Sequence, residues 1–176
     1  MSINIFGMKC DLNTQIIEIT FLKKKEIPKE IQFLTQLIVL KLDYNYIKEI
    51  PKEIQYLIKL IELNLEHNDI EKIPSEIQYL IHLNYLLVGY NQIKEIPKEI
   101  QYLIKLIKLN LGINKIKEIP KEIQFLTQLT YLLLYNNEIN EIPTEIQFLI
   151  QLTGLFLNVN KIKKNTKRNS IFATND

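Results

Sequence analysis

The chain has 176 residues, one cysteine and a formal net charge of +2, and 47% of its residues are hydrophobic. This composition is too apolar for a disordered chain, and the balanced charge predicts no general attraction for nucleic acid or an anionic membrane. One cysteine excludes an internal disulfide, and no apolar stretch approaches the roughly 18 residues of a membrane-spanning helix.

Two residue types recur along the chain with the same period. Each copy lies 23 residues after the previous one, and the two series stay in phase through six copies. The prolines are Pro28, Pro51, Pro74, Pro97, Pro120 and Pro143. The asparagines are Asn45, Asn68, Asn91, Asn114, Asn137 and Asn160. Such self-similarity is typical of a solenoid, in which each repeat is one structural unit stacked on the next.

The repeat frame divides the chain into three parts. Residues 1–36 are predicted to form an N-terminal cap and a degenerate first repeat, in which Leu22 replaces the asparagine. Residues 37–164 contain five full repeats of 23 residues and one shortened repeat. Residues 165–176 form a C-terminal tail, whose Ile171 and Phe172 are expected either to cover the last repeat or to pair two chains end to end.

The first part of each unit predicts a short strand. In the first full unit, Leu40 and Leu42 alternate with Lys41 and Asp43, which is the period-two pattern of a strand with one buried face. Because this pattern returns every 23 residues, the strands are expected to stack in parallel.

The second part of each unit predicts a turn and a short helical segment on the opposite side. Pro51 fixes the backbone and donates no hydrogen bond, which suits a turn. After it, Ile54, Leu57 and Ile58 are expected to share one side of a short helical turn that faces the core. Neighbouring units share that core, so stability is expected to arise only in the array.

These residues resemble the leucine-rich repeat family over roughly residues 14–164. The Ile-Pro-x-x-Ile segments resemble its 23-residue Ras-suppressor-like and bacterial type, although pairs such as Gln55-Tyr56 stand where many bacterial copies carry Ile-Gly. The resemblance implies an α/β fold, a curved right-handed solenoid with a parallel sheet on the concave face and short 3-10 or helical turns on the convex face. It also implies that the six asparagines form a structural hydrogen-bonded ladder.

The concave face is the predicted binding surface. From the third full unit onward, its outward strand positions carry aromatic and aliphatic side chains, where exposed apolar patches usually mark interaction sites. The predicted partner-binding residues are Tyr85, Leu87, Tyr90, Ile113, Tyr131, Leu133, Tyr135 and Phe156. The alternative is that these aromatic columns only pack on one another. Gly89 and Gly112 share a column, so a partner is expected to approach the backbone closely there.

Toward the N-terminus the same face becomes polar. The side chains expected there are Glu18, Asp43, Glu62, Glu66 and His67. They lack a recognisable ligand spacing, so the sequence predicts an acidic patch that steers a basic partner and no metal site. His82 is expected to be an ordinary surface residue. On the convex face, neighbouring rings are expected to stack along one column, with a second contact surface as the alternative; the column is Phe33, Tyr56, Tyr79, Tyr102, Phe125 and Phe148.

No nucleophile elbow, phosphate-binding glycine loop, paired-cysteine motif or nucleotide fingerprint occurs in the sequence. The prediction is therefore a non-catalytic module that binds another protein, with no cofactor, no catalytic residue and no nucleic acid partner. The alternatives are a sensor or regulatory repeat module of a larger enzyme or signalling assembly, and a self-assembling structural protein. A monomer is favoured over an end-to-end dimer. The first residues lack the pattern of a signal peptide, which favours the cytoplasm, whereas the family resemblance leaves a secreted or surface location as the alternative.

Overall fold

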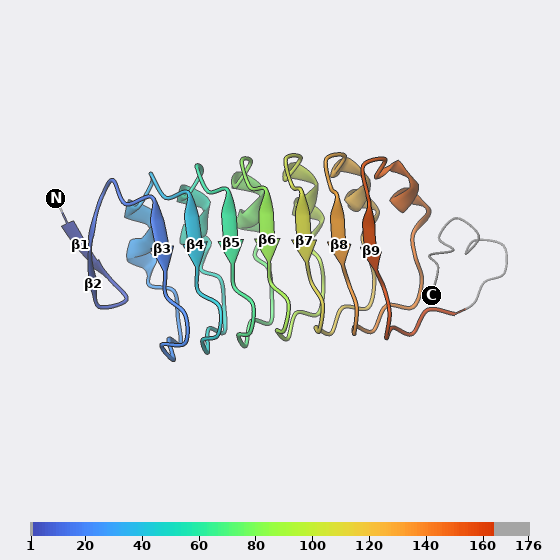
Figure 1. Ribbon diagram of the computed structural model, residues 1–176, viewed down its shortest axis with the longest axis horizontal. Helices are drawn as coiled ribbons and strands as arrows, with labels where there is room; N and C mark the ends of the chain where they lie inside the picture. The colour runs from blue at the N-terminus through green and yellow to red at the C-terminus, as the bar shows by residue number, and fades with distance from the viewer. Residues whose placement is uncertain (1, 164–176) are drawn as a thin grey trace.

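The computed structural model describes residues 2–163. Within this range the chain forms a two-stranded hairpin, followed by a regular array in which strands and 3-10 helices alternate (Figure 1). The strands lie side by side in chain order, and the helices lie behind them. The predicted tail at residues 165–176 lies outside the described residues.

Seven parallel strands form one sheet in sequence order. They are β3 (Ile16–Glu18), β4 (Val39–Lys41), β5 (Glu62–Asn64), β6 (Tyr85–Leu87), β7 (Lys108–Asn110), β8 (Tyr131–Leu133) and β9 (Gly154–Phe156). Residues 23 apart are paired in register, so Leu40 lies beside Leu63 and Leu63 beside Leu86. The predicted α/β solenoid with a parallel sheet is confirmed.

A 3-10 helix follows each repeated proline on the other side of the array. These helices are η1 (Lys29–Phe33), η2 (Lys52–Tyr56), η3 (Ser75–Tyr79), η4 (Lys98–Tyr102), η5 (Lys121–Phe125) and η6 (Thr144–Phe148). The proline caps each helix with extended backbone, as at Pro51 with φ −68° and ψ 150°. Its missing N–H costs nothing there, because the first N–H groups of a helix have no partner within the helix.

The core lies between the sheet and the 3-10 helices and is built from leucine and isoleucine. The residues Leu60, Leu63, Leu65, Ile70, Ile73, Ile77 and Leu80 of one repeat have no exposed surface. Ile58, which was expected to face the core, is 52% exposed, and that expectation is wrong. The 3-10 helix ends at Tyr56 and the chain bends at Leu57, so Ile58 points to solvent beside the start of the next strand.

The N-terminal hairpin closes one end of the core. It consists of β1 (Ser2–Ile5) and β2 (Met8–Asp11), which pair antiparallel. Phe6 and Gly7 connect them with φ values of 57° and 85°, the two positive values that a tight two-residue hairpin turn requires. Ile5 and Cys10 are buried against the first repeat, and burial raises the pKa of the Cys10 thiol.

None of the helices within residues 2–163 has the length and apolar character needed to cross a bilayer.

Candidate binding site on the sheet face

The outward side of the sheet presents four columns of side chains, which together are called the sheet face here. The first two columns lie on the strands and the other two follow the strand ends. The first column is Val39, Glu62, Tyr85, Lys108, Tyr131 and Gly154, and the second is Lys41, Asn64, Leu87, Asn110, Leu133 and Phe156. The third is Asp43, Glu66, Gly89, Gly112, Tyr135 and Asn158, and the fourth is Tyr44, His67, Tyr90, Ile113, Asn136 and Val159.

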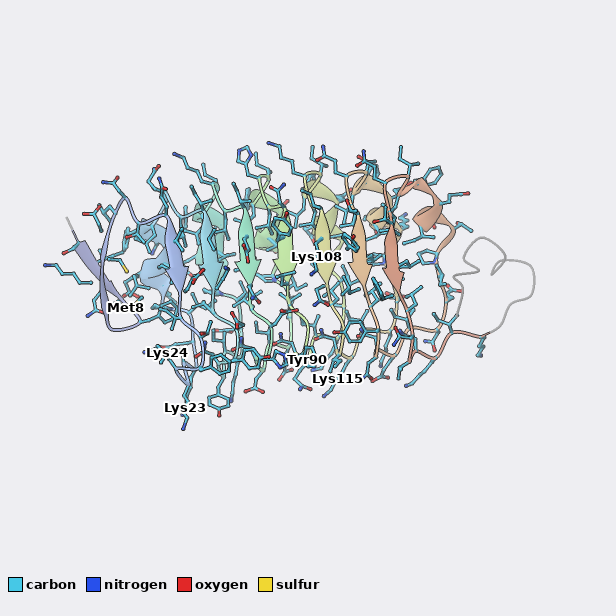
Figure 2. The ribbon with its side chains drawn as sticks, in the orientation of Figure 1. Met8, Lys23, Lys24, Tyr90, Lys108 and Lys115 are labelled. Carbon is cyan, nitrogen blue, oxygen red and sulfur yellow. The ribbon has the colours of Figure 1, made fainter. Side chains whose placement is uncertain are left out.

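All eight predicted partner-binding residues belong to this face, on or just after β6 to β9. Tyr85, Tyr131 and Phe156 are 38%, 45% and 46% exposed. Tyr90 is also exposed, at the margin of the sheet where Figure 2 labels it. The other four are half-buried, because neighbouring side chains on the face cover part of each; they are Leu87, Ile113, Leu133 and Tyr135.

The acidic charge near β3 to β5 is partly neutralised by a lysine from the middle strand. Lys41 Nζ lies 2.9 Å from a carboxylate oxygen of Glu18 and 3.8 Å from one of Glu62. The hydrogen bond that Lys41 donates to the Glu18 carboxylate and the charge of Glu62 raise the pKa of Lys41. Asp43 accepts a hydrogen bond of 3.2 Å from Asn64 Nδ2.

The two glycines of the third column are covered by side chains of the chain itself. A Cβ atom at Gly112 would lie 2.4 Å from the ring of Tyr135, and one at Gly89 would lie 3.2 Å from the amide of Asn110. Asn110 also donates a hydrogen bond to the Glu66 carboxylate and accepts one of 3.0 Å from the Gly112 N–H. The expectation that a partner approaches the backbone at these glycines is therefore wrong.

Tyr135 joins this network to the margin of the sheet. Burial, a hydrogen bond with Tyr90 and the charge of Glu66 raise the pKa of Tyr135 to about 12. Glu66, Asn110 and the Gly112 N–H thus form one hydrogen-bonded group, and Tyr135 and Tyr90 form a second beside it.

An aromatic stack that the sequence analysis missed runs along the fourth column. Phe21 and Tyr44 have ring centroids 4.4 Å apart, Tyr44 and His67 4.1 Å, and His67 and Tyr90 3.9 Å. All four residues have positive φ, between 53° and 57°. The signal was available, since each ring stands one residue before the ladder position, 23 residues from the next. His67 is therefore sandwiched between two rings.

The aromatic column of the 3-10 helices behaves differently from the expectation. Its rings are about half exposed, as Tyr56 at 50% and Tyr102 at 51% show. Among the described residues, ring-on-ring stacking joins the four rings beside the sheet and no pair of this column. The prediction of stacking on the convex face is therefore wrong for the described residues.

The ladder asparagines are buried or half-buried and bind backbone of two repeats. Asn68 Oδ1 accepts a hydrogen bond of 2.9 Å from the Ile47 N–H, and its Nδ2 donates 2.9 Å to the Leu42 carbonyl of the preceding repeat. The same Nδ2 reaches Leu65 of its own repeat. The pattern recurs from Asn45 to Asn160. These amides satisfy turn backbone that would otherwise be buried without partners.

Models of known protein families match the repeats of this chain. Two leucine rich repeat family models match residues 59–80 and 81–139. No curated protein matches the chain by sequence.

Three solved structures illustrate the likeness. A leucine-rich repeat protein of Leptospira interrogans is 33% identical with a TM-score of 0.66, and the match covers 85% of this chain and 44% of that one. An internalin from Listeria monocytogenes is 30% identical with a TM-score of 0.76, covering 85% and 43%. The Arabidopsis receptor kinase HAESA, in complex with the peptide hormone IDA and the co-receptor SERK1, is 34% identical with a TM-score of 0.74, covering 85% and 26%.

This chain spans less than half the length of each of these proteins. The repeated sequence, the strand and 3-10 helix array and the asparagine ladder agree with the family models and the solved structures. The chain belongs to the leucine-rich repeat family.

Proposed function

We propose that the chain is a non-catalytic module that binds an extended segment of a partner protein on the sheet face. The observation that carries the proposal is the exposure of Tyr85, Tyr131 and Phe156 on strands β6 to β9. Such rings offer large contact area at low cost in conformational entropy.

The other repeats show which residues the fold accepts at the positions of these rings. The column that holds Tyr85 and Tyr131 also holds Glu62 and Lys108, and it keeps the same strand register throughout. The fold therefore accepts charged residues at these sites, and packing of the repeats does not require the two tyrosines there. Tyr131 also rests on Gly154, where a Cβ would lie 2.5 Å from the ring, so its orientation is held before binding.

The charges on the sheet face are expected to decide in which direction the bound segment runs along it. The carboxylates Glu18, Asp43, Glu62 and Glu66 lie around β3 to β5 and outnumber Lys41 among them. A bound segment is expected to place basic residues over β3 to β5 and apolar residues over β6 to β9, because complementary charge orients a partner. The complex of HAESA with a peptide hormone supports a binding role of this general kind.

The test is a comparison of two double variants. Tyr85→Ala with Tyr131→Ala is expected to abolish capture of protein partners from the native source and to leave the thermal midpoint nearly unchanged. Tyr56→Ala with Tyr102→Ala is the matched control, because those tyrosines lie on the 3-10 helices and are somewhat more exposed than Tyr85 and Tyr131. Capture of the same partners by the sheet-face variant would move the binding site elsewhere.

A further inference from the structure

One edge of the array carries an apolar and cationic patch that is separate from the sheet face. The strand-start edge is the set of turns that lead from each 3-10 helix into the next strand, at the top of Figure 1. Three successive turns there carry an exposed isoleucine followed by a basic residue or histidine. The patch consists of Ile58, Lys59, Ile81, His82, Ile104 and Lys105.

The isoleucines of this patch are exposed at 52%, 50% and 53% for Ile58, Ile81 and Ile104. A groove of about 320 Å³ runs beside them between consecutive turns. It is lined by Ile38, Lys59, Ile61, His82, Asn84 and Lys105. The groove adds the apolar side chains of Ile38 and Ile61 to this edge, and no carboxylate belongs to its lining.

The repeats themselves show that the fold does not demand these residues. The same two positions hold Thr35-Gln36 before the patch and Thr127-Gln128 after it. Both flanking turns keep the same core contacts, since Leu34 and Leu126 are fully buried. The patch is thus confined to the centre of the array, at sites where packing permits polar residues.

Within the described part of the chain, no carboxylate forms an ion pair with the lysines of the patch. Lys59 Nζ donates a hydrogen bond of 2.6 Å to the Gln36 amide oxygen, and Lys105 Nζ lies 3.0 Å from His82 Nδ1. Within residues 2–163 the ion pairs involve other lysines, and Glu62, beside Ile61, is paired with Lys41 on the sheet face. The patch is positively charged, so it complements a negatively charged partner.

We propose that the strand-start edge binds an acidic amphipathic helix of a partner protein, laid along the array. Repeats are spaced about 4.8 Å apart along the sheet, which is close to the helical pitch of about 5.4 Å. Apolar residues at every third and fourth position of a helix would therefore meet Ile58, Ile81 and Ile104 in turn, and flanking carboxylates would meet Lys59 and Lys105. A second copy of this chain is a poor occupant, because a two-fold axis on the patch would place lysines against lysines.

The test uses a synthetic helix of about 15 residues with leucines on one face and glutamates on the other, a length at which isolated helices begin to form. Binding is followed by methyl NMR of the isoleucines. We expect shifts at Ile58, Ile81 and Ile104 and none at Ile150, which lies in the equivalent position of the last turn and has Gln151 beside it. A scrambled peptide of equal composition is the ligand control.

Three variants use residues that the array already contains. The exchange I58T/K59Q/I81T/H82Q/I104T/K105Q copies the flanking turns and is expected to weaken binding at least about tenfold, or about 1.4 kcal/mol. The charge-only variant K59Q/K105Q is expected to weaken it severalfold and to remove most of its salt dependence. The extension T127I/Q128K is expected to strengthen binding, so the proposal stays testable even where the sixfold exchange fails to fold.

Four results would overturn the proposal: no binding of the amphipathic peptide, equal binding of the scrambled peptide, unchanged binding by the charge-only and extension variants, or shifts confined to other isoleucines. Sedimentation with vesicles of phosphatidylglycerol that is lost in K59Q/K105Q, without peptide binding, would assign the patch to a membrane surface instead. The double variant Tyr85→Ala with Tyr131→Ala is expected to bind the helical peptide normally, so the two binding proposals fail or succeed independently.

Discussion

The imidazole of His67 lies on the phenol ring of Tyr90, with centroids 3.9 Å apart and planes 19° apart. Both residues adopt the left-handed backbone conformation, at φ 53° and 54°. That conformation costs roughly 1–2 kcal/mol for a residue with a side chain, and an aromatic pair returns about 0.5–1.5 kcal/mol. The stack therefore offsets part of a backbone cost that the turn after each strand imposes on every repeat.

Removing the middle ring of the stack is expected to lower stability. His67→Ala deletes contacts to both Tyr44 and Tyr90, so the free energy of unfolding in urea should fall by about 1–3 kcal/mol. His67→Phe keeps a flat ring at the same position and should recover most of that loss. Equal losses in the two variants would show that stacking contributes little and that another property of His67 matters.

The turn positions that carry no ring should respond to residues that tolerate left-handed backbone. Val159 has φ 57° and is 69% exposed, which is an unfavourable place for a β-branched residue. Val159→Asn is expected to raise the free energy of unfolding by roughly 0.5–1 kcal/mol. The reciprocal change, Asn136→Val at φ 52°, should lower it by a similar amount. Effects of the same sign in both variants would contradict this account.

The sequence was sufficient for the parts of the fold that burial determines. Leu40 indicates a strand because the core accepts only apolar residues at its position. Pro51 indicates a turn because the turn favours proline there. Ile58 was misplaced because the pattern does not show where a 3-10 helix ends. The contact of Tyr135 with Gly112 was missed because it depends on the direction of a side chain that crosses between repeats, which no period in the sequence records.

A methyl group at Gly112 is expected to displace the ring of Tyr135. The added Cβ would lie 2.4 Å from two ring atoms, so Gly112→Ala should cost about 1–3 kcal/mol of stability as an overpacked site. Gly89→Ala is the matched control, because its nearest contacts, the Asn110 amide and the Gly112 carbonyl oxygen, lie at 3.2 Å and overlap much less than the ring at Gly112. Unfolding curves should separate the two, and an equal loss would mean that both glycines matter for the backbone instead.

The ionisation of Tyr135 should make stability fall at alkaline pH. Its pKa is raised from 10.0 to about 12, so the folded chain keeps a proton that the unfolded chain loses near pH 10. The stabilisation is complete below pH 10 and is lost as pH rises toward 12. Tyr135→Phe lacks this group, so its unfolding free energy should decline less than that of the parent chain across this window. If the unfolding free energies of the two chains fell in parallel, the tyrosine that ionises last would be a residue other than Tyr135.

Asn91 links adjacent repeats through hydrogen bonds of its side-chain amide. Its Oδ1 accepts from the Ile70 N–H at 2.9 Å, and its Nδ2 donates to the Leu65 carbonyl at 2.9 Å and to Gly89 at 3.0 Å. Asn91→Leu keeps the volume but leaves the buried Ile70 N–H without a partner, at about 1–3 kcal/mol, whereas the Leu65 carbonyl keeps its hydrogen bond from Asn68 Nδ2. We expect a loss of roughly 1–3 kcal/mol in the free energy of unfolding.

The control for Asn91 is Asn140→Leu, because the Asn140 side chain is exposed and its backbone N–H and carbonyl make its hydrogen bonds to the neighbouring repeats. That variant should change stability by less than about 0.5 kcal/mol. Hydrogen exchange adds a local readout, since the Ile70 N–H should lose protection in Asn91→Leu while the strand amides of β8 keep theirs. An unchanged melting temperature together with a protected Ile70 N–H would show that backbone contacts alone hold adjacent repeats together and that the amide ladder is dispensable.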